Sequence, residues 1–154
     1  LDGMLVYTAD KNGEGDRYFC KDGKIQRESD DGSRDSRYPK EDDHELDVPL
    51  AVLVNGNSAS ASEVFTGAVM DYDAGIVVGT TTFGKGIVQN LIPLGDGTAI
   101  KLTTAHYYTP NGFDLHGKGL EPDVVVEMDE ELQKKAVVEL SEDNQLQAAI
   151  EAMN

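Results

Sequence analysis

The chain has 154 residues, the size of one domain, and its 29 acidic against 13 basic side chains give a formal net charge of −16. That charge argues against a nucleic-acid-binding protein and against binding to an anionic membrane, because phosphates demand a basic face. The single cysteine, Cys20, permits no internal disulfide and no cysteine-based zinc site, and no apolar run reaches the roughly 18 residues of a membrane span.

The first part of the chain divides into two segments of different character. Residues 1–21 are predicted to form a β-ribbon, because two short runs with apolar and aromatic residues, 4–8 and 17–19, flank a turn-rich link. Residues 22–47 are almost wholly polar and rich in acidic side chains, with hardly an apolar residue to bury. We therefore expect this second segment to be an acidic, mobile surface loop.

A strand, a helix and a second strand are predicted next. Residues 49–54 form a continuous apolar run, which is typical of a strand buried on both faces. Apolar residues then recur at helical spacing over 61–72, which predicts a helix. Ser60 and Glu63 form a candidate capping box at the start of this helix. A second apolar run, 75–79, follows the helix. This order predicts a parallel β-α-β crossover.

Three further β-type segments follow, at 87–93, 98–109 and 122–127. The first two are joined by a Gly-Asp-Gly turn and should pair as a hairpin. We expect the core segment to span residues 48–128 and a helical tail to occupy 129–154. The tail carries a small apolar stripe, formed by Leu146, Ala149, Ile150 and Met153.

Ser60 is a candidate nucleophile because it lies between a buried strand and a helix N-terminus, where α/β enzymes present nucleophiles and anion-binding amides. Backbone N–H groups there can stabilise an oxyanion, which is worth about 3–4 kcal/mol per donor. The alternative is that Ser58 or Ser60 merely caps the helix, which contributes about 1 kcal/mol. Taken alone, the turn favours the cap.

A nucleophilic serine needs a base. The three histidines are weak candidates. His44 lies in the charged loop, His106 in a Thr-rich strand and His116 in a Gly-flanked turn. A lysine can serve if burial lowers its pKa toward neutrality. Lys85 is the best candidate, since it follows a buried strand and lies between two glycines. Taken alone, such a lysine is more often an exposed turn residue.

The lysine loop also nearly matches a phosphate-binding loop. Gly79, Gly84 and Lys85 have the required spacing, but Gly86 replaces the Ser or Thr that would hold magnesium. The residues after it continue as a strand rather than opening a helix. An NTPase is therefore not predicted.

Four separated motifs follow one another along the chain. They are Val-Asn-Gly-Asn-Ser-Ala-Ser-Ala-Ser-Glu at 54–63, Thr-Phe-Gly-Lys-Gly-Ile-Val-Gln at 82–89, Leu-Thr-Thr-Ala-His-Tyr-Tyr-Thr-Pro at 102–110 and Gly-Leu-Glu-Pro-Asp at 119–123. Taken together, they resemble the motifs of the C-terminal-processing (tail-specific) serine peptidases. The resemblance as a whole extends over residues 48–127. The resemblance implies an α/β fold with a crotonase/ClpP-like layered β-α core and a mixed sheet, incomplete at its N-terminal side in this chain.

The same resemblance assigns roles to four residues. It implies that Ser60 is the nucleophile, that Lys85 is its general base, that Gln89 orients the lysine and that the Ala61 N–H donates to the oxyanion. Lys85 and Gln89, four positions apart, would face the same side of a strand if that strand begins early. No metal or organic cofactor is implied.

The implied function is a serine endopeptidase that cuts proteins near their C-termini through an acyl-enzyme. Its expected substrates are unstructured protein or peptide C-termini, gathered by a PDZ domain in the parent chain, and the expected location is the bacterial cell envelope, outside the cytoplasm and membrane-anchored. The second oxyanion donor and the PDZ domain are not in this chain, so we expect the fragment to be soluble and weakly active or inactive. Two alternatives stay open: a crotonase-type acyl-CoA enzyme, and a non-enzymatic binding module in which Ser60 is only a helix cap.

Overall fold

The structure is a computed structural model that describes residues 2–38 and 48–154. Within these residues the backbone forms nine strands and three helices. The strands are β1 Gly3–Ala9, β2 Arg17–Lys21, β3 Lys24–Glu28, β4 Arg34–Tyr38, β5 Ala51–Val54, β6 Ile76–Gly79, β7 Ile87–Pro93, β8 Ala99–Tyr108 and β9 Val124–Val125. The helices are α1 Ala61–Asp71, α2 Glu130–Gln133 and α3 Asn144–Ala152.

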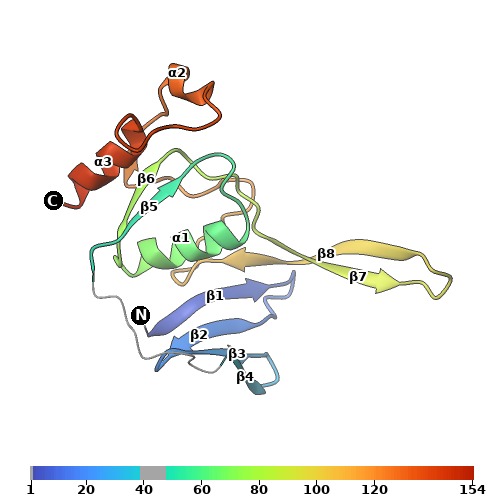
Figure 1. Ribbon diagram of the computed structural model, residues 1–154. Coiled ribbons are helices and arrows are strands. Elements are labelled where there is room, and N and C mark those ends of the chain that lie inside the picture. Colours follow the sequence, from blue (N-terminus) through green and yellow to red (C-terminus); the bar gives the residue numbers. More distant parts are fainter. Residues whose placement is uncertain (1, 39–47) are drawn as a thin grey trace.

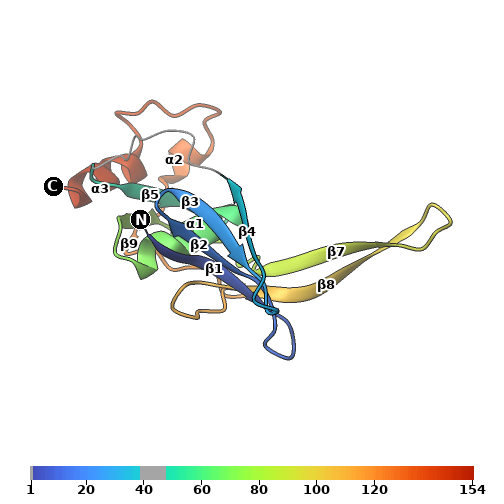
Figure 2. The same cartoon turned by 90° about the horizontal axis from the view of Figure 1, so that it is seen from below.

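Six strands form an antiparallel sheet in the order β4-β3-β2-β1-β8-β7. The pairing of β1 with β2 confirms the predicted N-terminal β-ribbon, and the pairing of β7 with β8 confirms the predicted hairpin. Figures 1 and 2 show β7 and β8 extending beyond the rest of the molecule as a two-stranded arm. Because β8 also pairs with β1, it joins the N-terminal strands to the segment that follows Lys85.

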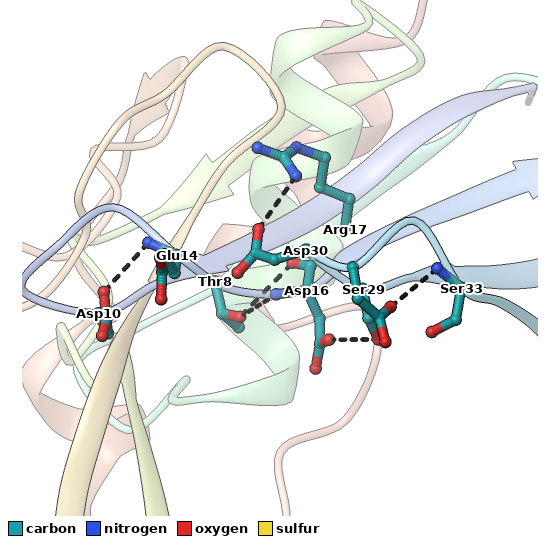
Figure 3. Close-up of polar contacts among 9 residues, drawn as sticks. Thr8, Asp10, Glu14, Asp16, Arg17, Ser29, Asp30 and Ser33 are labelled. Carbon is teal, nitrogen blue, oxygen red and sulfur yellow. Dashed lines mark hydrogen bonds and ion pairs between the residues drawn. The ribbon is translucent and has the colours of Figure 1, made fainter.

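The prediction of a surface loop over residues 22–47 is wrong where β3 and β4 lie, since these strands pair with each other as a hairpin. The segment has too few apolar residues to show the alternation that marks a strand. Backbone ladders hold it, together with polar contacts such as the ion pair of Arg27 with Asp16 (2.7 Å) and the hydrogen bond from Ser29 to Asp16 (3.0 Å), the latter shown in Figure 3. Residues 39–47 of the predicted loop lie outside the described residues.

A second, three-stranded sheet has the order β5-β6-β9, and its strands run parallel. The helix α1 connects β5 to β6, so the predicted β-α-β crossover is confirmed. A small apolar core lies between this helix and the sheet, formed by Val54, Val69 and Val77 with Val52 and Met70 packed against them. Both parallel strands end at the same edge, so the turn that carries Ser60 and the loop that carries Lys85 emerge there together.

The elements are stacked in layers. Figure 1 shows α1 and α3 on opposite sides of β5 and β6, and α1 contacts β1 of the antiparallel sheet. The Tyr72 hydroxyl, at the end of α1, donates to the Met4 carbonyl (2.9 Å) and so ties the helix to β1. This combination of parallel and antiparallel pairing with helices confirms the α/β class. None of the helices in the described residues is both long and apolar enough to cross a membrane.

Candidate active site

The turn before α1 separates the roles of two neighbouring serines. The Ser58 hydroxyl accepts a hydrogen bond from the Asn55 N–H (3.1 Å), and the Ser58 N–H donates to the Asn55 carbonyl (2.8 Å). Ser58 therefore closes the turn. Ser60 stands at the N-cap position of α1, directly before the first helical residue.

The backbone of Ser60 is strained. Its φ of 58° and ψ of −112° differ from the extended conformation that an N-cap residue normally adopts. A residue other than glycine in such a sparsely populated region costs on the order of 1–3 kcal/mol, and such residues cluster at functional sites. A strained serine on a sharp strand-to-helix turn is also how α/β-hydrolases expose a nucleophile. The conformation favours a functional role over a simple cap.

A buried carboxylate links Ser60 to the lysine loop. Glu63 is 0% exposed. Its Oε2 accepts hydrogen bonds from the N–H groups of Ser60 (2.9 Å) and Lys85 (2.8 Å). Its Oε1 accepts from the Gly84 N–H and from the Thr82 hydroxyl, both at 2.6 Å. The backbone N–H groups of the two predicted catalytic residues therefore donate to the same oxygen atom.

Glu63 is ionised at neutral pH. Burial raises the pKa of its carboxyl group, but the hydrogen bonds donated by Thr82, Gly84, Lys85 and Ser60 outweigh burial and lower the pKa below its ordinary value. Each oxygen already accepts two hydrogen bonds. Glu63 is therefore an anchor that fixes backbone positions.

The same network continues through Thr82 to a third segment. The Thr82 hydroxyl accepts from the Leu120 N–H (2.8 Å), and the Thr82 N–H donates to the Leu120 carbonyl (3.0 Å). Both residues are buried. On the other side, the Phe83 N–H donates to the Ser58 carbonyl (2.9 Å). The lysine loop is thus held between the serine turn and the segment that leads to β9.

Local sequence patterns indicate little of the anchoring roles of Glu63 and Thr82. The Ser-x-x-Glu spacing predicts the hydrogen bond between Ser60 and Glu63, which is present, but not the three bonds that Glu63 accepts from the distant loop. Thr82 carries no local signal beyond its place next to the glycine-flanked lysine.

The side chain of Lys85 is exposed in this structure, although its backbone is fixed by Glu63. The burial that a lysine base requires is therefore not provided by the described residues. The structure brings the backbones of Ser60 and Lys85 together and leaves the lysine side chain open to solvent.

The two other predicted site residues, Gln89 and Ala61, make no hydrogen bond to Glu63 in the part of the chain that the structure describes. The Gln89 amide donates to the Thr103 hydroxyl (3.2 Å). Because β7 begins at Ile87, after Lys85, strand alternation does not place Gln89 beside that lysine. The N–H of Ala61, the first residue of α1, has no hydrogen-bond acceptor within the described residues, so it is free to bind an anion.

Among the described residues, His106 and His116 make no hydrogen bond to Glu63 or Thr82. His44 is outside the described residues, and the rings of His106 and His116 contact each other, with centroids 4.8 Å apart. Within the described residues no group of three or more His, Cys, Asp or Glu side chains is arranged to hold a metal ion. A hollow of about 480 Å³ lies beside α1, but neither Ser60 nor Lys85 lines it.

Residues 2–126 match peptidase family S41. The chain belongs to this family. The match covers the strained serine turn, the lysine loop and the anchor between them, so the geometry described above is that of an S41 chain.

Relatives of this S41 chain have names that agree with the assignment. A carboxy-terminal-processing protease of Bartonella bacilliformis is 54% identical over 79 residues, which are 51% of this chain and 18% of the relative. A probable CtpA-like serine protease of Staphylococcus epidermidis is 52% identical over 80 residues, 52% of this chain and 16% of the relative. The matched part spans less than a fifth of each curated relative. The family match and these names confirm the predicted resemblance to the C-terminal-processing serine peptidases.

Two solved structures are similar to the S41 fold described here. The photosystem II D1 C-terminal processing protease has a TM-score of 0.65 and 37% sequence identity, over 82% of this chain and 28% of that chain. A lipoprotein from Streptococcus agalactiae has a TM-score of 0.60 over 98% of this chain and 44% of that chain. Its identity is 17%, so it supports the fold alone.

Proposed function

We propose that Ser60 and Lys85 are the catalytic dyad of a serine endopeptidase that cleaves protein substrates near their C-termini. One observation carries most of the argument: the strained Ser60 backbone and the Lys85 backbone donate to the same oxygen of the buried Glu63. A helix cap needs neither strain nor a connection to a lysine loop. Membership of family S41 supports the same assignment.

In the proposed reaction, neutral Lys85 accepts the hydroxyl proton of Ser60 while the Ser60 Oγ attacks the carbonyl carbon of the substrate. The carbonyl oxygen becomes an oxyanion, which the N–H of Ala61 and the N-terminal end of α1 stabilise. The tetrahedral intermediate then expels the amine, which takes the proton from Lys85, and leaves an acyl group on Ser60. Water hydrolyses this ester and regenerates the serine. We assign Gln89 to orienting Lys85 on the family resemblance alone, which requires the Gln89 amide to leave the Thr103 hydroxyl that it contacts here.

The chain on its own is proposed to be weakly active or inactive. Its Lys85 side chain is exposed, so the described residues do not supply the burial that a lysine base requires. Burial of this side chain in the complete protein is part of the proposal. Because the base must be unprotonated to act, cleavage is expected to rise with increasing pH.

The substrate and setting of the complete protein are also proposals. Its substrates are expected to be unstructured C-terminal segments, because relatives are named for carboxy-terminal processing. A PDZ domain that gathers these segments, a crotonase-like layering of the complete core and a location in the bacterial cell envelope follow from the family resemblance.

The test compares cleavage of an unstructured, apolar-tailed peptide by the complete protein and by its Ser60→Ala and Lys85→Ala variants. Ser58→Ala and Ser62→Ala are matched controls from the same turn. Folding of each variant is checked by circular dichroism and thermal unfolding. Loss of cleavage confined to Ser60→Ala and Lys85→Ala supports the dyad. Normal cleavage by Ser60→Ala contradicts it, and so does a loss that follows stability alone.

A further inference from the structure

A compact polar cluster lies at the base of the β7–β8 arm. The Nδ1 of His106 is 3.2 Å from Oδ2 of Asp114, and the other oxygen of Asp114 accepts the His116 N–H at 3.0 Å. The two imidazole rings meet edge to face, with centroids 4.8 Å apart. Because an ionised carboxylate can only accept, the proton in the first contact belongs to His106 Nδ1.

This cluster is adjacent to the lysine loop. His106 lies opposite Ile87, the first residue of β7. The next residue, Tyr107, donates its N–H to the carbonyl of Gly86 (2.9 Å), directly after Lys85. The strand that carries His106 therefore holds the chain on the C-terminal side of Lys85.

The segment that follows Asp114 packs on both glycines that flank Lys85. The Gly84 carbonyl accepts the N–H of Gly117 (2.9 Å). A Cβ atom at Gly84 would lie 2.8 Å from the Gly119 nitrogen, and one at Gly86 would lie 3.0 Å from the His116 nitrogen. Only glycines allow this close approach, so the 115–119 segment sets the path of the backbone through Lys85.

Several charged and titratable groups surround the cluster. Burial raises the pKa of Asp114, but the hydrogen bonds from the His116 N–H and from His106, together with the positive charge of Lys118, lower it below its ordinary value. From the turn between β1 and β2, Asp10 and Lys11 line the same hollow as His106 and Tyr108. Asp114 is thus a carboxylate held between β8 and the 115–119 segment.

We propose that His106 is a positioning residue for Lys85. By holding Asp114, it fixes the start of the 115–119 segment to β8, and this segment in turn fixes the backbone from Gly84 to Gly86. Thr82 fixes the other end of the same segment through Leu120. The inference rests on the proposed role of Lys85 as the base, and His106 itself touches no substrate.

The test uses the complete protein with two substitutions at one site. His106→Phe keeps a ring of similar size and removes the donor, whereas His106→Asn keeps a donor close to the Nδ1 position. His106→Phe is expected to lower kcat about ten- to hundredfold with little change in KM, because a small displacement of a catalytic group has effects of this order. His106→Asn should restore most of kcat. Asp114→Asn combined with His106→Phe should be no worse than His106→Phe alone.

Hydrogen–deuterium exchange gives a readout that does not depend on activity. The amides of Gly84 and Lys85 donate to Glu63, so their exchange reports local opening of the loop. We expect faster exchange in His106→Phe and wild-type rates in His106→Asn.

The possible failures can be told apart. Unchanged kcat and unchanged exchange in His106→Phe overturn the positioning role, as does a loss of kcat that His106→Asn does not restore. If the wild-type protein cleaves no peptide and Ser60→Ala changes nothing, the proposed function fails. In that case the exchange rates alone decide whether His106 holds the lysine loop.

Discussion

The serine–lysine region and the N-terminal hairpins use charge in different ways. In the first, the buried Glu63 accepts hydrogen bonds from three backbone N–H groups and one hydroxyl, and each donor fixes a point of the chain. In the second, charged side chains pair near the surface, as Arg34 does with Glu28 (2.8 Å) and Arg17 with Asp30 (3.6 Å), the latter shown in Figure 3. The buried charge fixes backbone positions, whereas exposed ion pairs of this kind contribute little to stability.

The largest effect should come from Glu63→Ala. This change leaves the donors on Ser60, Gly84, Lys85 and Thr82 without their acceptor. The hydrogen bonds of Gly84 and Thr82 are buried, and each unpaired buried group costs about 1–3 kcal/mol. We expect the free energy of unfolding, measured by urea titration, to fall by about 3–5 kcal/mol, the range for breaking a buried charged network. Glu28→Ala, in the hairpins, is the control. Equal effects of the two substitutions would remove the distinction between the regions.

The pH dependence of stability tests the role of the buried Glu63 carboxylate separately. The pKa of Glu63 in the folded chain is below its ordinary value of 4.5, so the ionised group contributes stability above about pH 4.5 and this contribution is lost as the pH falls through the folded pKa. The difference in unfolding free energy between wild type and Glu63→Gln should therefore be largest near pH 7 and shrink below about pH 4.5. A difference that stays constant from pH 7 to pH 3 contradicts this account.

A smaller effect is expected at Thr82. Thr82→Val keeps the shape of the side chain but removes the hydroxyl that joins Glu63 to the Leu120 N–H. The free energy of unfolding should fall by about 1–3 kcal/mol, since a buried donor and a buried acceptor lose their partner. Thr82→Ser retains the hydroxyl and should cost clearly less. Equal losses for the two variants would show that packing of the methyl group, rather than the hydroxyl, matters.

The smallest effect should come from Arg34→Ala. The Arg34 side chain is 72% exposed, and exposed ion pairs contribute about 0–1 kcal/mol that salt screens further. Urea titrations at low and at high salt should differ little between this variant and wild type. A loss comparable with that of Thr82→Val would show that the hairpins depend on their surface charges.

Sequence patterns predicted the parts of this fold that rest on apolar periodicity. The runs at 49–54 and 75–79 became β5 and β6, and the helical spacing over 61–72 became α1. The strands β3 and β4 were missed because their ladders are lined by charged side chains such as Arg27 and Glu28, which give no alternation.

The meeting of the serine turn and the lysine loop was also predictable from the sequence, but the contacts that hold them together were not. Ser60 and Lys85 follow two neighbouring parallel strands, and that topology alone brings them to one edge. The convergence on Glu63 was not predictable, since three of its donors come from a loop distant in sequence, and no local spacing encodes such contacts. The strain at Ser60 likewise depends on the path of the whole turn.

The most direct test of the central claim is to map where a serine-directed phosphonate reacts with the complete protein, by mass spectrometry of its peptides. If Ser60 and Lys85 form the dyad, one adduct is expected, on Ser60. It should form about a hundredfold or more slowly in Lys85→Ala, because the base that activates the hydroxyl is gone. Labelling of Ser60 at the wild-type rate in Lys85→Ala would contradict the role of the lysine. Loss of cleavage through an adduct at another hydroxyl, with Ser60 unmodified, would contradict the assignment of the nucleophile.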